Sequence, residues 1–547
     1  MKRAFRYDGK ELDKEIVNYN PFDSKALNYM KQYQNCSVTE NGAIGYKTTT
    51  HPLVDLNFMV SSLRNCSNKV ITNHFIKAYY ESPKYAVKWL FFLRDILEGL
   101  GERRSFRVCM KYLANSHIEI AKAVMELIPE YGRYDDLLVF LETDLEDAVC
   151  KFMKKQLEKD ICAKKQGNPI SLLAKWLPSI NTSSEKTKRN ANILVHKFGM
   201  TPREYRKTLS ELRSYSNVVE VKLSAQKWSE VEYEKVPAKA NLKYENTFKR
   251  HDEERYVQYL LEVLTGNAQL TAKGIMPYEL VHRLMMNRIY FKSGTIKDNL
   301  FIELMWKKLV EQGFQNDWGF DDCIVVADGS GSMYTAVSGS KEIMAIEVCN
   351  SLAIYFAEQL KGVFHNKAIT FSATPQLIDL ELGKNLKEKL EIMLSHCEVS
   401  STNIEAVFDM LLDMAISNEV PKEEIPKQVL IISDMEFDMA SSPSYLYGNR
   451  KEKWNKFTPT LFETIEKRYE EAGYKMPKLI FWNVCGRTNT IPKIDNEQGL
   501  CLLSGFSQNA MKIATNTEQK DPYESLIQVL DGERYEKVEQ ALIGLIA

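Results

Sequence analysis

The chain has 547 residues, and its 72 lysines and arginines nearly balance 73 aspartates and glutamates, for a formal net charge of −1. Hydrophobic residues make up 44% and charged residues 27%, which excludes a disordered or fibrous chain and predicts more than one folded core. The overall charge indicates neither a nucleic-acid nor a membrane partner, so any such indication must come from local segments.

The first residues, MKRAFRYDGKELDKE, lack the apolar stretch of a signal peptide. No apolar run reaches the roughly 18 residues that a membrane-spanning helix needs. The ten cysteines are scattered and form no C-x-x-C pair, so we expect reduced thiols packed in cores rather than a zinc site. These features predict a monomeric, cytoplasmic protein with no membrane partner.

From about residue 70 to residue 315 the apolar periodicity is helical. The segments 82–101 and 117–132 place apolar residues at three- and four-residue spacings and end in glycine, and 299–313 does the same. Consecutive amphipathic helices with short polar connections predict an all-helical, HEAT-like array. We therefore expect a first domain over 1–315, of which 1–65 is a less regular lead-in.

The pattern changes near residue 316, where strands begin to alternate with helices. Strands are expected at 323–327, 367–378, 427–434, 478–485 and 499–505, and helices at 341–360, 402–416, 458–473 and 524–532. This alternation predicts a Rossmann-like α/β domain over 316–547, with a mainly parallel sheet covered on both faces.

Oxygen-bearing side chains follow two of these strands and precede one helix. Because binding loops of open α/β sheets lie beyond the carboxyl ends of the strands, we expect these side chains to converge. They are Asp328, Ser330, Ser332, Thr402 and Asp434. Such oxygens suit a hard divalent cation, Mg²⁺ before Mn²⁺ or Ca²⁺. The D-G-S-G-S segment alone would also fit an ordinary turn; its combination with the other two segments favours a metal site.

These residues and their order resemble the metal-ion-dependent adhesion site of von Willebrand factor A domains. The resemblance implies that the three hydroxyls are direct or near-direct ligands and that the two aspartates anchor the site. It also implies that the ion can take an acidic group of a partner protein as its last ligand. Ser400 stands where the family usually has glycine, two residues before Thr402, which puts the shape of that loop in question.

The segments 42–64, 89–107, 131–138 and 205–244, together with the metal domain, resemble an uncharacterised two-domain family, DUF2828. That family is similar to the TROVE-plus-A-domain proteins typified by the Ro autoantigen. The link to Ro rests on domain order, helical character and the segment RDILEGLGERR. It implies that the array binds small non-coding or misfolded RNA, with single-stranded ends in a basic channel and duplexes on an outer basic surface.

A basic stretch is consistent with such binding. From Lys186 to Arg250, fifteen lysines and arginines face seven aspartates and glutamates, and aromatic residues that could stack on bases are interleaved. A solvated helix face with core aromatics is the alternative. The candidate RNA contacts are Lys186, Lys188, Arg189, Arg203, Arg206, Lys207 and Arg213, with a second cluster at Arg103, Arg104 and Arg107. An inter-helix ion-pair network with Asp95 and Glu102 is the alternative for the second cluster.

Motifs of catalysis are missing from the sequence. We find no nucleophile elbow, Walker A loop or H-E-x-x-H segment, and Arg133, Asp135 and Asp136 are typical of a helix-start cap with a structural ion pair. We therefore expect no enzymatic activity. Two functions remain open: a Ro-like RNA-binding protein, or a metal-dependent protein–protein scaffold with no nucleic-acid role.

Overall fold

The structure is a computed structural model of the chain. It describes residues 35–546 except 217, 287–295, 315–321, 338–339, 341, 372–373, 398–402, 423, 439–460, 488–489, 494–499 and 515–520. Within this part of the chain, no helix combines the length and apolar character needed to cross a membrane.

A short hairpin and two short helices open the described chain. Strands β1 (Cys36–Val38) and β2 (Ile44–Tyr46) pair antiparallel, and α2 (Pro52–Phe58) and α3 (Val60–Leu63) follow. Proline at the first position of α2 suits a helix start, where no backbone donor is lost.

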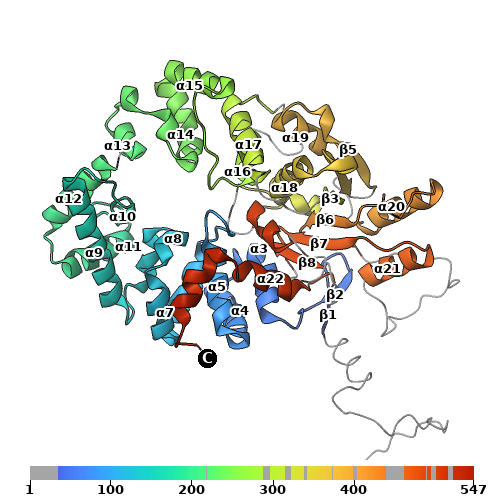
Figure 1. Ribbon diagram of the computed structural model, residues 1–547, viewed down its shortest axis with the longest axis horizontal. Coiled ribbons are helices and arrows are strands. Elements are labelled where there is room, and N and C mark those ends of the chain that lie inside the picture. Colours follow the sequence, from blue (N-terminus) through green and yellow to red (C-terminus); the bar gives the residue numbers. More distant parts are fainter. Residues whose placement is uncertain are drawn as a thin grey trace, which may run out of the picture.

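A long run of helices forms the first part of the molecule, as predicted. They are α4 (Asn68–Glu81), α5 (Pro83–Arg94), α6 (Arg104–Ser116), α7 (Ile118–Met125), α8 (Ile128–Tyr131), η2 (Tyr134–Phe140), α9 (Glu146–Lys165), α10 (Leu173–Trp176), α11 (Glu185–Phe198), α12 (Pro202–Tyr215), α13 (Val219–Ser224), η3 (Trp228–Glu230), η4 (Tyr233–Lys235), α14 (Ala238–His251), α15 (Glu253–Thr265), α16 (Pro277–Met285) and α17 (Leu300–Gly313). They follow a curved path around the left and top of Figure 1.

Polar side chains set where several of these helices begin. Ser82, Ser184, Thr201 and Asn299 each accept a hydrogen bond from a backbone N–H in the first turn of α5, α11, α12 and α17. Gly199 adopts a positive φ of 68° and ends α11, a conformation that glycine reaches without strain.

The second part contains a six-stranded sheet in the order β5-β4-β3-β6-β7-β8. Its strands are β3 (Cys323–Asp328), β4 (Lys367–Phe371), β5 (Gln376–Asp379), β6 (Gln428–Ser433), β7 (Lys478–Asn483) and β8 (Cys501–Ser504). All neighbouring strands are parallel except β4 and β5. The predicted mainly parallel sheet is confirmed, but the single strand expected over 367–378 is two antiparallel strands.

Helices cover both faces of this sheet. The alternating side chains of β3 divide between two cores: Val325 and Ala327 join the core that contains α18 (Ala345–Gln359), and Ile324 and Val326 join the core that contains α20 (Glu405–Ser417) and α21 (Leu461–Glu471). Burial on both faces explains why the strands are continuous apolar runs rather than alternating ones. The remaining elements are η5 (Gly331–Tyr334), η6 (Gly362–Phe364), η7 (Leu380–Leu382), α19 (Leu386–Ser395), η8 (Gln508–Ile513), α22 (Pro522–Leu530), η10 (Glu533–Tyr535) and α23 (Glu536–Leu542).

The opening segments of the chain pack on the second part, and the last helices pack on the first. The opening hairpin bridges to the second part at Gly42–Asp438 and Tyr46–Ile491, and α2 packs on β8. In return, α22 and α23 cross back to pack on α5 and α7, while α16 and α17 contact α18 at the other end of the array (Figure 1). The array is therefore closed through the second part, and the division at residue 316 remains a prediction about the sequence.

Candidate functional site

Asp328 ends β3 and lies completely buried. The backbone N–H of Ser330 donates to its Oδ1 at 2.9 Å, and the hydroxyl of Ser433 donates to its Oδ2 at 2.6 Å. Burial raises the pKa of Asp328, and these hydrogen bonds oppose the rise. Parallel pairing of β3 with β6 explains why Ser433, the last residue of its strand, meets Asp328.

Asp434 directly follows β6 and is 1% exposed. The backbone N–H of Glu436 donates to its Oδ1 at 3.2 Å, and Arg487 Nη2 lies 3.3 Å from its Oδ2. Burial and then the negative charge of Asp328 raise the pKa of Asp434, against the effect of Arg487. The structure thus brings the two predicted aspartates together.

Two hydroxyls complete the described part of the predicted set. The Oγ atoms of Ser330 and Ser332 are 3.0 Å apart. Gly329 lies between the strand and the serines, and a Cβ there would lie 3.3 Å from the Cα of Cys397, so a larger residue would crowd that segment. Cys397 precedes 398–402, and Thr402 lies outside the described residues together with Ser400.

The donor set fits a hard divalent ion. Asp328 and Asp434 are two buried carboxylates with one neighbouring arginine, so a further positive charge would relieve their repulsion. Carboxylate and hydroxyl oxygens are what Mg²⁺ prefers. Within the described ranges no three His, Cys, Asp or Glu side chains gather as a metal cluster, so a site here depends on the hydroxyls.

We expect Asp328→Asn to abolish a stabilisation of the protein by Mg²⁺. At 100-fold excess of Mg²⁺ over its Kd, binding raises the free energy of unfolding by about 2.7 kcal/mol, and this increase should vanish when a negative ligand is lost. Thermal unfolding with and without Mg²⁺ measures it. Asp322→Asn, at the other end of the same strand and paired with Lys427, is the control. An equal response to Mg²⁺ in Asp328→Asn would contradict the site.

The predicted basic stretch is largely paired with carboxylates, many of them outside the stretch. Arg189 pairs with Glu142 at 2.5 Å. Other pairs are Lys188 with Glu185, Lys197 with Asp147, Lys207 with Glu211, and Lys249 with Glu245. Arg213 donates to the carbonyls of Ala174 and Leu177, which fixes α12 on α10. Lys186, Arg203 and Arg206 are exposed.

The aromatic residues of the basic stretch are partly buried in the core and partly exposed. Tyr205 is buried and its hydroxyl donates to the carbonyl of Pro178, and Tyr233 is buried among other aromatic rings. Trp228 stacks on His251 with ring centroids 4.5 Å apart. Tyr215 is 37% exposed. The core alternative therefore holds for Tyr205 and Tyr233.

Two residues of the second predicted cluster, Arg103 and Arg104, line a basic cavity of about 400 Å³. Six basic residues and one acidic residue line it, together with small and apolar ones; the charged residues are Arg64, Arg94, Arg103, Arg104, Arg133, Lys239 and Glu102. We call this space the arginine cavity. The amino terminus of α6 lies at its wall, and the helix dipole adds positive potential there.

The positive charges of the arginine cavity are only partly neutralised. Carboxylates pair with four of them: Arg64 with Glu102, Arg94 with Asp136, Arg133 with Asp135, and Lys239 with Glu279. Arg104 donates to the carbonyls of Leu63, Arg64 and Cys66 and to Asn68, none of which carries a charge. Arg103 is exposed and makes no ion pair with another described residue. Partial desolvation of the guanidinium lowers the pKa of Arg103. The positive charges of the nearby Arg133 and Arg107 lower it further.

Arg107 does not line this cavity, but it shares Asp136 with Arg94 and Asp135 with Arg133. Its guanidinium pairs with Asp136 at 2.6 Å and with Asp135 at 2.9 Å. Asp136 also accepts the backbone N–H of Arg133 at 3.0 Å, so it caps η2 as the sequence indicates. Arg107 therefore belongs to an inter-helix ion-pair network, but not to the one expected with Asp95 and Glu102. The predicted partners Asp95 and Glu102 pair elsewhere, with Arg534 and Arg64.

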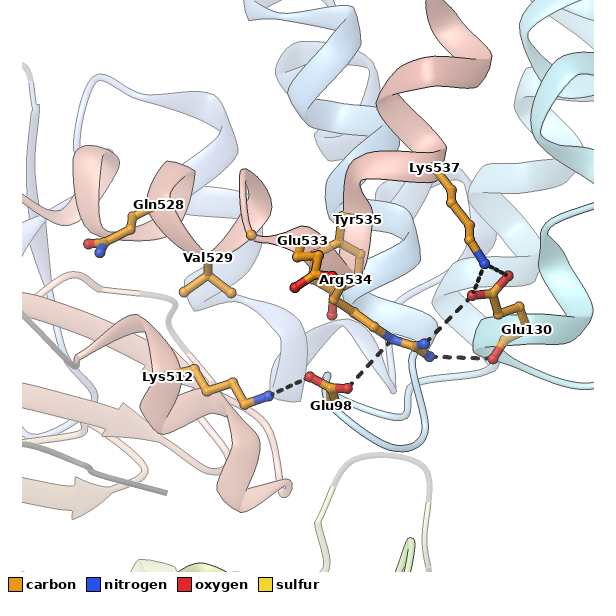
Figure 2. A pocket seen from close by; sticks show the side chains of 10 residues that line it. Glu98, Glu130, Lys512, Gln528, Val529, Glu533, Arg534, Tyr535 and Lys537 are labelled. Carbon is orange, nitrogen blue, oxygen red and sulfur yellow. Dashed lines mark hydrogen bonds and ion pairs between the residues drawn. The ribbon is translucent and has the colours of Figure 1, made fainter. Parts of the chain in front are cut away.

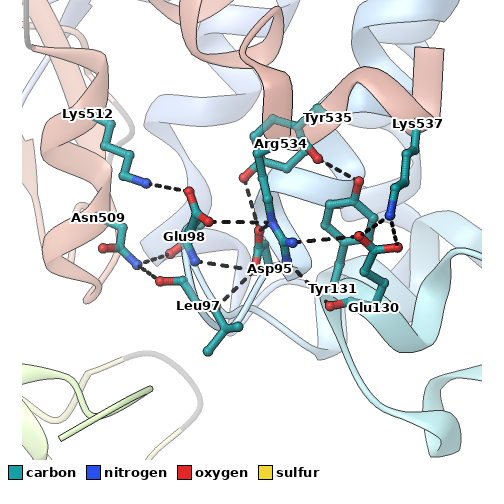
Figure 3. A network of polar contacts seen from close by, with 11 residues as sticks. Asp95, Leu97, Glu98, Glu130, Tyr131, Asn509, Lys512, Arg534, Tyr535 and Lys537 are labelled. Atoms are coloured by element: carbon teal, nitrogen blue, oxygen red, sulfur yellow. Dashed lines mark hydrogen bonds and ion pairs between the residues drawn. The ribbon is translucent and has the colours of Figure 1, made fainter. Parts of the chain in front are cut away.

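A larger cavity, of about 620 Å³, lies where η10 and α23 meet the loop after α5 (Figure 2). Its charges are paired across the junction: Lys512 lies 3.0 Å from Glu98, and Lys537 lies 2.9 Å from Glu130. Arg534 reaches Asp95 at 2.7 Å in the same network (Figure 3). Because these ion pairs join η8, η10 and α23 to segments of the first part, the larger cavity lies at a junction between the two parts.

Sequence reasoning missed several residues at both sites. Arg64, Arg94, Arg133 and Lys239 come from four separate segments, and the sequence does not show that these segments meet. Arg487 likewise stands alone in the sequence. Ser433 had a usable signal, because it precedes Asp434 at the end of a predicted strand.

Comparison with known proteins identifies both parts of the chain. Residues 39–131 and 185–316 match Domain of unknown function (DUF2828), and residues 322–542 match Domain of unknown function (DUF7788). Uncharacterized protein L728 of Acanthamoeba polyphaga mimivirus is 29% identical over 534 residues, which cover 91% of this chain and 87% of that protein. A crystal structure of the Deinococcus radiodurans RO (RSR) protein aligns with 84% of this chain and 93% of its own, with 13% identity and a TM-score of 0.42. Separate family models thus match the two parts of the chain, DUF2828 the helical part and DUF7788 the part that contains the sheet.

Proposed function

We propose that the protein binds single-stranded RNA at the arginine cavity and a divalent cation, Mg²⁺ first, at the edge of its sheet. The arginine cavity is the observation that carries the RNA proposal, since six basic residues line its roughly 400 Å³ and two of them, Arg103 and Arg104, make no ion pair with another described residue. Phosphates release counterions when they meet such a surface, which drives binding at low salt. Guanidinium groups also give phosphates paired hydrogen bonds.

The surroundings of the cavity suit an extended strand. A neighbouring cavity of about 440 Å³ shares Ile96, Gly274 and Met276 with the arginine cavity. It also shares Glu98 and Lys512 with the larger cavity of about 620 Å³. The three spaces therefore adjoin in a row. Lys273 is exposed beside the middle one and adds a positive charge. On α11 and α12, the exposed Lys186, Arg203, Arg206 and Lys207 would contact phosphates of an adjoining duplex.

The metal centre would consist of Asp328, Ser330, Ser332 and Asp434, with Thr402 as a further ligand. Asp328 and Asp434 carry two buried carboxylates beside one arginine, and this imbalance of charge supports the metal centre. When bound, the ion would offer a Lewis-acidic position that an acidic side chain of a partner protein can occupy. Ser433 and the backbone of Ser330 would hold the Asp328 carboxylate in place.

Electrophoretic retardation of a small hairpin RNA with a single-stranded 3′ tail, measured across salt, tests the RNA proposal. We expect Arg103→Gln combined with Lys239→Gln to weaken binding by at least about tenfold, because two charged contacts are lost. The salt dependence should fall by about one ion per lost phosphate contact. The matched control is Lys186→Gln with Arg203→Gln, which removes two exposed charges from α11 and α12.

Each result has a distinct meaning. Loss confined to the first variant would support the cavity, and loss confined to the second would move the contact to the basic stretch. If the unmodified protein does not retain the RNA at low salt, the RNA proposal is wrong. The buried aspartate pair would then favour the second candidate, a metal-dependent protein–protein scaffold with no nucleic-acid role.

A further inference from the structure

Arg487 lies between two carboxylates from distant parts of the chain. Its Nη2 is 3.3 Å from Asp434 Oδ2 and 3.0 Å from Glu40 Oε2. Because one nitrogen serves both, the two carboxylate oxygens are no farther apart than these distances combined. Glu40 belongs to the turn of the opening hairpin, so the hairpin reaches the edge of the candidate metal centre.

A buried glutamate holds this arrangement together. Glu436 is completely buried; its Oε1 accepts the backbone N–H of Arg487, and its Oε2 accepts the backbone N–H of Glu40, both at 2.9 Å. The side chain of Asn41 donates to the Glu436 carbonyl at 2.6 Å. Arg487 and Glu40 are thus fixed by their backbones, and the guanidinium has two carboxylates within reach.

The positive charge at Asp434 comes from this arginine. Among the described residues, Arg487 makes the ion pair of Asp434, and no ion pair reaches Asp328. A divalent ion held by the two aspartates would therefore lie close to the guanidinium, and like charges at such short distances repel. The ion and the arginine compete for the same carboxylate.

We propose that Arg487 is a resident counter-cation of Asp434 that weakens divalent-ion binding, and that Glu40 provides the alternative carboxylate that draws it away. This inference rests on the metal centre proposed above. Ion binding favours Arg487 on Glu40, and by thermodynamic reciprocity a firm Arg487–Glu40 pair favours ion binding. Since Thr39 donates to the carbonyl of Phe437 and Gly42 bridges to Asp438, occupancy of the centre is coupled to docking of the hairpin.

Two substitutions in the full chain should change Mn²⁺ affinity in opposite directions, as measured by calorimetric titration. Arg487→Gln removes the competing charge, so we expect binding to tighten by roughly tenfold. Glu40→Gln removes the alternative partner and leaves Arg487 on Asp434, so binding should weaken. Lys427→Gln is the control, because it removes one charge from the opposite ends of β3 and β6, roughly 20 Å away along the strands. Hydrogen exchange of residues 35–46 should slow with Mn²⁺ in the unmodified protein and respond less in both variants.

Unchanged or weaker binding in Arg487→Gln, or unchanged or tighter binding in Glu40→Gln, would overturn the inference. Arg487→Lys, which keeps the charge, should stay near the unmodified affinity and guards against a folding effect. If Asp328→Asn binds Mn²⁺ as the unmodified protein does, the metal centre itself is wrong. If the unmodified protein binds no Mn²⁺, a gain in Arg487→Gln supports the competition, and no gain overturns both proposals.

Discussion

Asp136→Ala should lower the free energy of unfolding by about 3–5 kcal/mol, as expected when one member of a buried ion pair is removed. Asp136 is completely buried and holds Arg94, which is 2% exposed, at 2.8 Å. It also accepts from Arg107 and from the backbone of Arg133. The change leaves the Arg94 guanidinium buried without its carboxylate, and it loosens the cap of η2.

Chemical denaturation followed by circular dichroism measures this loss. Asp144→Ala is the matched control, since Asp144 is exposed in the same segment, and it should change stability by less than about 0.5 kcal/mol. A similarly small effect of Asp136→Ala would mean that Arg94 finds another partner. Because Arg94 and Arg133 line the arginine cavity, the folded fraction of the variant should also retain RNA less well.

Arg534→Ala should cost a similar amount, about 3–5 kcal/mol, at the junction between the two parts. Asp95 is completely buried, and Arg534 donates to both of its oxygens, at 2.7 and 3.2 Å (Figure 3). The guanidinium also lies 4.5 Å from the ring centre of Tyr131. Asp95 raises the pKa of Arg534 through this hydrogen bond, so the arginine is charged in the pair.

Denaturation together with hydrogen exchange of α23 detects the loss, because α23 should open from α5 and α7 before the rest unfolds. Lys537→Ala, which removes an exposed charge paired with Glu130 in the same network, should cost less than about 1 kcal/mol. Arg534→Lys should fall between the two, since it keeps the charge but not the paired hydrogen bonds. Equal effects of Arg534→Ala and Lys537→Ala would show that the buried pair is not what holds the junction.

The sheet and its carboxyl edge were predictable because both depend on local patterns. The apolar run 323–327 and the polar turn after it predict a buried strand with Asp328 at its end, and β3 ends there. The pairing of β4 with β5 was not predictable in this way. Ser372, Thr374 and Pro375 interrupt the apolar residues of 367–378 and are a turn signal, but they do not indicate that the second strand pairs antiparallel with the first.

The basic surface was harder to predict because charge counts along the chain omit partners from elsewhere. Lys197 belongs to the basic stretch, yet Glu146 and Asp147 from α9 neutralise it. The arginine cavity is the reverse case. Arg64 and Lys239 are far apart in sequence, and only the closure of the array brings them to one space.

The crossing of α22 and α23 onto α5 also concerns how the chain is made. Lys88 in the middle of α5 is completely buried, and its partners Asp531 and Glu539 are joined to it at 2.7 and 2.5 Å. A ribosome adds more than four hundred residues after Lys88 before these carboxylates exist. α4, α6 and α8 can pack on α5 early, but Lys88 and the part of α5 that contacts α22 and α23 lack these partners until the chain is nearly complete. Contacts of such long range slow folding and expose apolar surface to other chains meanwhile.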